Sequence, residues 1–357
     1  MTTEPRSFAS PTSSITDVPR SEVIASLEWT SDLSSSAGPE KGDTFPISWL
    51  ADDSLVSAAG DPVSHASPSG LDTRRFVGEP PSFSMEVLNE MEDFVGWGGD
   101  GPKPVGMLAV GDTVYLAAQN VPGRHLDDDA VMNWGHGYDA HIFASTDGGR
   151  TWSPALSDLG EVMFPGRSFG APAFLNFGKN NEHAIDSFAY ALSGVGWDNG
   201  SQCVLGRVPL DAIQDRSRWE FVAGFEADGS PQWSDNLVSA APVLRHPGYL
   251  GAVEIVYLHG IDRYLLLGWR NKVKAEPGAG SELVVYDAPA PWGPFTLVHH
   301  EDPWETAELN PYNPRVPLKW YDHERNEGWL LFSGNWAHEG QTPNYRAHAR
   351  RFRLHLK

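Results

Sequence analysis

A hairpin pattern that recurs along the chain is the feature that most limits its fold. Each copy is an apolar run, a tight polar turn and a second apolar run that ends in small or polar residues. The interval between copies leaves room for two further strands, such as HIFASTD, ELVVYDA or RAHARRFRL. Repeated units of four strands predict propeller blades. The five copies start 58 to 76 residues apart, at Ile47, Val105, Ala171, Val238 and Pro314.

This pattern predicts an all-β protein, a five-bladed β-propeller in which radial repetition protects the strand edges. Two β-sandwiches are the alternative, but they do not call for similar hairpins at even spacing. The 36 glycines and 28 prolines are typical of many short strands joined by turns. We expect residues 1–40 to be a disordered or loosely packed N-terminal lead, and residues 41–357 to form a single propeller domain. The segment 85–94 fits either a strand or a short amphipathic helix.

An eight-residue motif supports the propeller. Residues 145–152, STDGGRTW, match S-x-D-x-G-x-T-W, the Asp-box of sialidase-like propellers. In such a turn the aspartate caps backbone N–H groups and glycine takes positive φ. We therefore interpret Asp147 as a turn stabiliser and not as a catalytic acid. A true sialidase would be expected to carry six blades, several Asp-boxes and an arginine triad, whereas this sequence shows a single Asp-box.

Charge and composition narrow the range of partners. The formal net charge is −21 and no run is rich in Lys or Arg, which argues against binding to a nucleic-acid backbone. No stretch approaches 18 consecutive apolar residues, so we expect no membrane span. The N-terminus lacks the apolar core of a secretory signal, so the default expectation is a cytoplasmic protein, and an extracellular one would need a leader outside this sequence. The single cysteine, Cys203, excludes an internal disulfide and is interpreted as a buried thiol.

Two aspartates frame the first hairpin. Folding it about Asp52 sets Asp43 directly opposite Asp61, with Cβ atoms within roughly 4.5 to 5.5 Å of each other. Like charges in that position repel, so one carboxyl group should keep its proton while the other ionises. The first strand of a propeller blade lies innermost, which would put both acids near the axis, where propellers bind ligands. A protonated acid beside a carboxylate suits glycoside hydrolysis; the alternative is two acids that only cap strand ends in solvent.

Several segments resemble one family of proteins. GDTFPISWLADDSLVSAAGD, GPKPVGMLAVGDTVYL, FGKNNEHAIDSFAYALSG, YDAPAPWGPFTLV and NPRVPLKWYDHERNEGWLLFSGNW, spread over residues 40–350, are similar to proteins with the domain of unknown function 4185. That resemblance implies a five-bladed sialidase-like propeller and, through the endo-D-arabinanases of glycoside hydrolase family 183, cleavage of α-linked D-arabinofuranose chains. The acids thought catalytic in those relatives match Asp43 and Asp61. The relatives read T-W-A-D-D where this chain has S-W-L-A-D-D, one residue more, so the substrate could differ.

Further residues could act at the axis. Lys103 lies just before the inner strand of the second blade, and Asn313 and Arg315 lie just before that of the fifth, positions from which a cation or an amide could bind sugar hydroxyls or an oxyanion. Trp49 is a further substrate-binding candidate. Asp186, at the start of the second strand of the third hairpin, could be a third acid that tunes the pair, or a turn cap.

The segment RHLDDDAVMNWGHGYDAH, residues 124–141, contains aromatic side chains that could stack on sugar rings. Trp134 and His136 are the candidates for such a subsite wall. A metal site built from its histidines and acids is the alternative, but their spacing follows no recognised ligand pattern. We predict neither a metal nor a cofactor.

Together these features predict a monomeric hydrolase that cleaves arabinofuranosidic or related linkages in an oligo- or polysaccharide partner. A non-catalytic carbohydrate-binding propeller and a polysaccharide lyase with a Tyr or His base are the alternatives.

Overall fold

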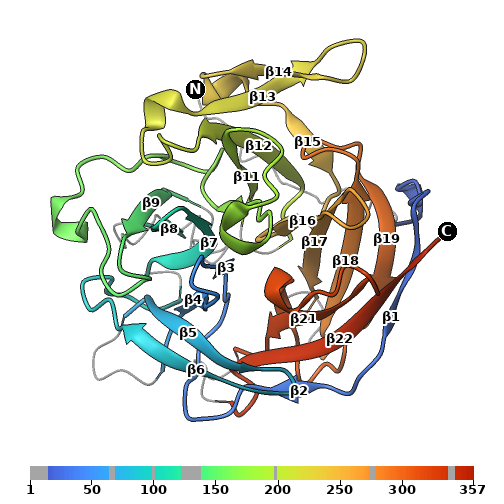
Figure 1. Ribbon diagram of the computed structural model, residues 1–357, viewed down its shortest axis with the longest axis horizontal. Helices are drawn as coiled ribbons and strands as arrows, with labels where there is room; N and C mark the ends of the chain where they lie inside the picture. The colour runs from blue at the N-terminus through green and yellow to red at the C-terminus, as the bar shows by residue number, and fades with distance from the viewer. Residues whose placement is uncertain are drawn as a thin grey trace, which may run out of the picture.

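The strands form five antiparallel sheets arranged around a central axis (Figure 1). This confirms the predicted all-β, five-bladed propeller. The helices of the described chain are short 3-10 turns of three residues. The computed structural model describes residues 15–63, 69–98, 101–121, 138–196, 199–272, 278–336 and 342–357.

Each blade begins with a strand near the axis and adds neighbours outward by antiparallel pairing. Blade 1 contains β3 (Ile47–Trp49), β4 (Leu55–Gly60), β5 (Leu71–Glu79) and β6 (Ser82–Asn89). Blade 2 contains β7 (Lys103–Val110), β8 (Thr113–Gln119) and β9 (His141–Ser145). Blade 3 contains β10 (Pro172–Phe174), β11 (Phe188–Gly194), β12 (Gln202–Pro209), β13 (Glu220–Phe225), β14 (Pro231–Ser234) and β15 (Pro242–Arg245).

The last two blades lie side by side in the ring (Figure 1). Blade 4 contains β16 (Glu254–Leu258), β17 (Arg263–Asn271), β18 (Ser281–Ala288) and β19 (Thr296–Glu301). Blade 5 contains β20 (Tyr312–Arg315), β21 (Glu327–Ser333), β22 (Ala347–Leu356), β1 (Ile24–Trp29) and β2 (Ser34–Ser35).

The N-terminal segment closes the ring. Strand β1 pairs with β22, with Ile24 opposite Leu356. Residues 24–35 therefore belong to blade 5, and the predicted loose lead of residues 1–40 is too long. Leu27 is buried in the cluster between blades 4 and 5. The sequence alone does not show this, because the partner of β1 lies at the other end of the chain.

One predicted hairpin is placed differently. The sequence pattern predicts that the fourth hairpin starts at Val238, but the inner hairpin of blade 4 is β16 with β17, and β15 pairs with β12 of blade 3. Residues 254–258 are almost all buried, whereas the residues of β15 are half-buried or exposed. An innermost strand is covered on both faces by neighbouring blades, so it is buried throughout. The greater burial of β16 therefore identifies it as the inner strand, although β15 and β16 look alike in the sequence.

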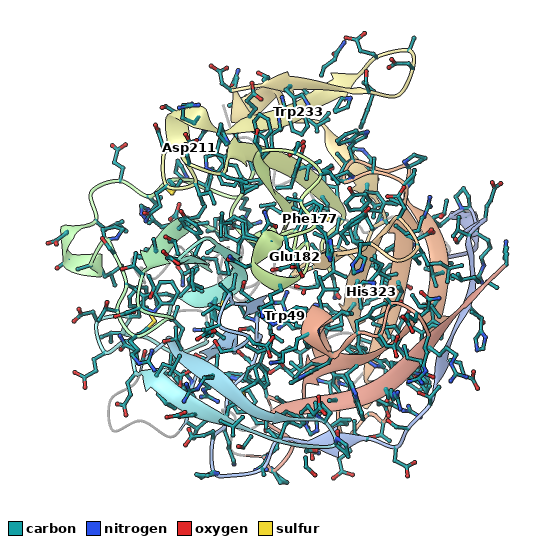
Figure 2. The ribbon with its side chains drawn as sticks, in the orientation of Figure 1. Trp49, Phe177, Glu182, Asp211, Trp233 and His323 are labelled. Atoms are coloured by element: carbon teal, nitrogen blue, oxygen red, sulfur yellow. The ribbon has the colours of Figure 1, made fainter. Side chains whose placement is uncertain are left out.

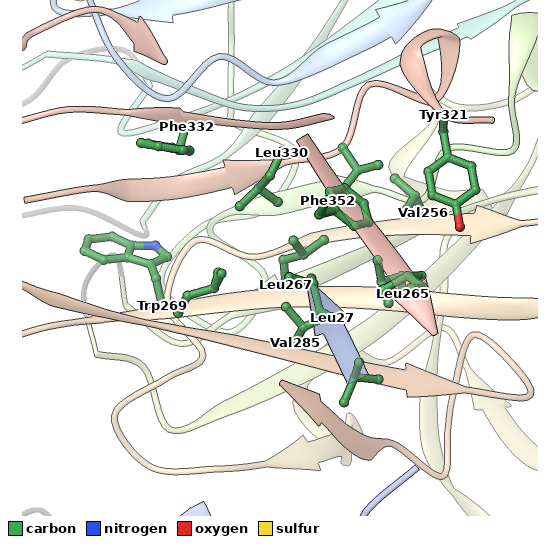
Figure 3. Close-up of a cluster of buried hydrophobic side chains, with 14 of the residues drawn as sticks. Leu27, Val256, Leu265, Leu267, Trp269, Val285, Tyr321, Leu330, Phe332 and Phe352 are labelled. Carbon is green, nitrogen blue, oxygen red and sulfur yellow. The ribbon is translucent and has the colours of Figure 1, made fainter. Parts of the chain in front are cut away.

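Apolar side chains fill the space between neighbouring blades. Figure 3 shows the cluster between blades 4 and 5, where Leu265 and Val285 pack with Leu330 and Phe352. All four side chains are fully buried. Burying such a side chain stabilises a fold by roughly 1.5 to 3 kcal/mol. These clusters hold the blades, and hence the loops at the axis, in fixed positions.

The Asp147 side chain stabilises the turn that follows β9. Its carboxylate accepts hydrogen bonds from Ser145 Oγ, from the backbone N–H groups of Arg150 and Thr151, and from Thr151 Oγ1. The two glycines of the turn have φ of 72° and 92°, a conformation that favours glycine. These contacts agree with a structural role for Asp147.

Candidate active site at the propeller axis

The backbone at the start of the first hairpin departs from the simple register that the sequence suggests. Strands β3 and β4 pair as expected for a fold about Asp52, with Ile47 opposite Ser57. Asp43, however, pairs with Gly60 and not with Asp61. Two residues between Asp43 and β3 have positive φ, of 66° and 41°, and they shift the pairing by one position. The predicted direct opposition of the two acids is therefore wrong by one residue.

The two carboxyl groups nevertheless share one buried environment. Asp43 is 5% exposed and Asp61 is 2% exposed. Burial and the neighbouring charge of Asp61 raise the pKa of Asp43 to about 8. Asp61 itself has a left-handed φ of 43°, which is rare for aspartate and is found where surrounding contacts hold the backbone. We call Asp43 and Asp61 the axial acid pair.

Asp61 is surrounded by donors. Lys103 Nζ lies 2.9 Å from Asp61 Oδ1, and the Gly98 N–H donates to the same oxygen at 3.0 Å. Burial raises the pKa of Asp61, while Lys103 and hydrogen bonds from Gly98 and Trp336 oppose that rise. Lys103 is the first residue of β7 and is 2% exposed. Its cation neutralises one negative charge, so Asp61 is the member of the pair that ionises.

Asp43 accepts its hydrogen bonds from neutral donors, tyrosine hydroxyl groups of blade 5, and the charge of the more distant Lys103 lowers its pKa without cancelling the rise. Tyr312 donates to Asp43 Oδ2 at 2.9 Å. The Tyr345 hydroxyl donates to the carbonyls of Gly60 and Asp61 at 3.2 and 3.3 Å. Neutral donors counter burial less than a cation does. The proton of the pair therefore belongs on Asp43 at neutral pH.

Arg315 braces the backbone next to Asp43. Its Nε donates to the Thr44 carbonyl at 2.9 Å, and its Nη1 donates to Glu254 Oε2 at 2.9 Å. Ser333 Oγ accepts from the Thr44 N–H at 2.9 Å. Burial raises the pKa of Glu254 to about 7, although Arg315 opposes the rise. These contacts tie blades 1, 4 and 5 together behind the acid pair.

The structure brings together only part of the predicted site. Lys103, Asn313 and Arg315 lie at the end of the axis that holds the acid pair. Asp186 lies at the hairpin turn of blade 3, where its oxygens accept from the Phe188 N–H and the Tyr190 hydroxyl, so it takes the turn-cap role and does not join the pair.

Trp49 ends β3 on the side of the hairpin turn, where its indole N–H donates to Asp53 Oδ1 at 2.9 Å. Figure 2 shows Trp49 and His323 near the centre of the ring, together with Glu182. Residues at these hairpin turns form the opposite end of the axis from Asp43. Trp134 and His136 lie outside the described residues.

Sequence reasoning missed Tyr312, Tyr345 and Glu254. They lie in three apolar or loop segments with no catalytic motif, and only the folded ring places them around residues 43 and 44. Within the described chain, no group of three or more His, Cys, Asp or Glu side chains is arranged to hold a metal ion. No helix in the same residues is long and apolar enough to cross a membrane.

No protein-family model and no curated protein matches this chain. Solved structures share its fold. A GH62 hydrolase in complex with xylotriose has a TM-score of 0.53 at 12% identity, covering 92% of this chain and 98% of its own. The α-L-arabinofuranosidase of Podospora anserina in complex with cellotriose has a TM-score of 0.52 at 12% identity, covering 93% and 98%. A GH43_1 enzyme from Xanthomonas citri has a TM-score of 0.51 at 11% identity, covering 90% of each chain. The chain thus has the propeller fold of these glycoside hydrolases.

Proposed function

We propose that this protein is a glycoside hydrolase that cleaves arabinofuranosidic linkages, as in D-arabinan or arabinogalactan, or closely related glycan linkages. The axial acid pair carries this proposal. Two buried carboxyl groups share one site, and a single lysine favours ionisation of one of them. Asp43 is the general acid, and Asp61 is the nucleophile or the base that activates water.

The chemistry follows from the two protonation states. Asp43, with a pKa of about 8, keeps a proton at neutral pH and can give it to the leaving glycosidic oxygen as the bond to the anomeric carbon breaks. Asp61 faces the positive charge that develops on the sugar. It either bonds to the anomeric carbon or takes a proton from the attacking water. The burial of both groups strengthens these electrostatic interactions.

The substrate class has two supports. The sequence resembles the family that includes endo-D-arabinanases over most of its length. One of the structures that shares the fold is an arabinofuranosidase by name, although at 12% identity. Both point to furanosides, and the chemistry of the acid pair suits any glycoside whose leaving oxygen must be protonated.

The decisive experiment compares the purified protein with Asp43→Asn and Asp61→Asn on mycobacterial arabinan and arabinogalactan, with product analysis. Each variant should lower kcat/KM by roughly 10² to 10⁴-fold, the usual loss when an acid or base is removed. Asp211→Asn is the matched control, because Asp211 is exposed on the rim of the ring (Figure 2). Glycan binding without any product from the wild-type protein would replace this proposal with a carbohydrate-binding propeller. Equal turnover by all four proteins would refute the roles of Asp43 and Asp61.

A further inference from the structure

Asn313 is a buried residue in an irregular stretch of strand. It is 1% exposed and has a left-handed φ of 52°. The pairing of β20 with β21 is interrupted here, with Tyr312 opposite Ser333 but Arg315 opposite Leu331. Two residues of β20 therefore face one residue of β21, which is a β-bulge. Bulges beside functional sites serve to re-aim a side chain.

The amide group of Asn313 has no hydrogen-bond partner within the described residues, at either Nδ2 or Oδ1. A buried amide without partners is destabilising. A further buried atom near the same backbone, Arg315 Nη2, also lacks a partner in this part of the chain. The simplest physical reading is that these polar atoms face a polar ligand.

Tyr312, which precedes Asn313, and Arg315, two residues after it, contact Asp43 and its neighbour Thr44. Tyr312 donates to Asp43, and Arg315 donates to the carbonyl of Thr44. The backbone of Asn313 is thus held between two contacts to residues 43 and 44. A ligand group bound to its amide would lie close to the bond that Asp43 protonates.

An amide offers N–H donors and a carbonyl acceptor, and a sugar hydroxyl both donates and accepts. We propose that Asn313 binds one hydroxyl group of the sugar whose glycosidic bond lies at the axial acid pair. Asn313 then selects sugars that carry a hydroxyl at that position and orients the ring for protonation by Asp43. This inference rests on the proposed function and names one determinant of substrate specificity.

The test uses Asn313→Gly, because glycine accepts the left-handed backbone while the substitution removes the side chain that carries the amide. Asn326→Gly is the matched control: Asn326 also has a φ of 52° but lies at the turn between β20 and β21. The first measurement is kcat/KM for para-nitrophenyl α-D-arabinofuranoside and its monodeoxy analogues. For the wild type, kcat/KM for one deoxy analogue should be about tenfold lower than for the parent substrate, because that analogue lacks the hydroxyl that makes one good hydrogen bond.

In Asn313→Gly, kcat/KM for the parent substrate should fall by about the same tenfold, and the difference in kcat/KM between the parent and that deoxy analogue should vanish. Asn326→Gly should keep the wild-type values for both substrates. A variant with lower activity and unchanged deoxy penalties would show that Asn313 is only structural and would overturn the inference.

A second measurement separates this inference from the proposed function. Calorimetric titration of an arabinofuranosyl tetrasaccharide into Asp43→Asn, with and without Asn313→Gly, reports binding in the absence of turnover. Binding that weakens by about tenfold with Asn313→Gly supports the contact even if the wild type releases no product, and in that case only the proposed function fails. Binding that is unchanged by Asn313→Gly overturns the inference. No binding and no hydrolysis would overturn both.

Discussion

Asp43 Oδ1 lies 2.4 Å from the position that a Cβ atom on Gly60 would occupy. No real Cβ makes so short a contact, so Gly60 is glycine because the carboxyl group of Asp43 needs the space. The same absent side chain leaves room for Thr44 Cγ2 at 3.2 Å and Lys103 Cδ at 3.4 Å. The absence of a side chain at Gly60, on the second strand, therefore sets where the Asp43 carboxyl group and the Lys103 side chain can lie.

Gly60→Ala should displace the Asp43 carboxyl group and lower kcat/KM by roughly 10²-fold, the usual effect of misplacing a catalytic group by about an ångström. The backbone of Gly60 is not in the left-handed region, so alanine is not strained by φ. Gly160→Ala is the control, because a Cβ on Gly160 would meet nothing within 4 Å. Wild-type activity of Gly60→Ala would mean that Asp43 need not hold its observed position.

The pH dependence of activity should reflect the two acids separately. In the proposed mechanism Asp43 donates a proton, so kcat/KM should decline above the Asp43 pKa of about 8. In the same mechanism Asp61 acts as a carboxylate, a form that Lys103 favours. Lys103→Met removes the cation at 2.9 Å, so the pKa of Asp61 should rise and the acid limb of the kcat/KM profile should move to higher pH. The rate profile of wild type and Lys103→Met from pH 4 to 9 checks this, and coincident acid limbs would contradict the assignment of Asp61 as the ionised member.

Part of this arrangement could be predicted from the sequence and part could not. The pairing of Ile47 with Ser57 follows from the turn at Asp52, and the alternation of apolar residues is enough to find it. The shift that pairs Asp43 with Gly60 comes from two non-glycine residues with positive φ, which no local preference predicts.

Long-range contacts account for the remaining differences. Tyr345 and Arg315 reach blade 1 from segments that are distant along the chain, and β1 is completed by a partner strand at the opposite terminus. Asp186 has the right residue type and a plausible place in its hairpin, but it lies at the turn end and not at the axial end. Which end of a hairpin faces the acid pair is a property of the closed ring.

The Asp43→Asn variant should become more stable relative to the wild type as the pH rises. The ordinary pKa of the side chain is 3.8, and in the folded protein it is about 8. Between these values the folded chain holds a proton that the unfolded chain releases, so the stability of the wild type falls as pH increases from about 4 to about 8. Asparagine does not ionise and escapes this loss. The difference in Tm between Asp43→Asn and wild type should therefore grow from pH 4.5 to pH 8, as melting curves would show, with Asp211→Asn unchanged. A constant difference would mean that the pKa of Asp43 is not raised.

Three imidazole rings join the hairpin turns of blades 3, 4 and 5 at the opposite end of the axis. The ring centroids of His183 and His259 lie 3.8 Å apart, and those of His259 and His323 lie 3.6 Å apart. Burial and the neighbouring imidazoles lower the pKa of His323 to about 4, and the pKa of His259 is lowered as well. Two acids face these rings. Glu182 Oε1 lies 3.8 Å from His183 Nε2. The charge of Asp322 offsets only part of the lowering of the His323 pKa. The rings pack against one another at interplanar angles of 32° and 34°.

Acid should therefore weaken this end of the propeller. As pH falls below 6.5 an unfolded histidine takes up a proton, whereas His323 in the folded chain resists protonation until about pH 4. Stability is complete above pH 6.5 and is lost between 6.5 and 4, because the unfolded chain binds more protons in that window. His323→Phe keeps a flat ring without the titration, so its Tm should exceed that of the wild type by an amount that grows from pH 7 to pH 4.5. Because the two proteins are compared at each pH, the contributions of the carboxyl groups cancel. Parallel Tm curves for the two proteins would show that His323 does not resist protonation.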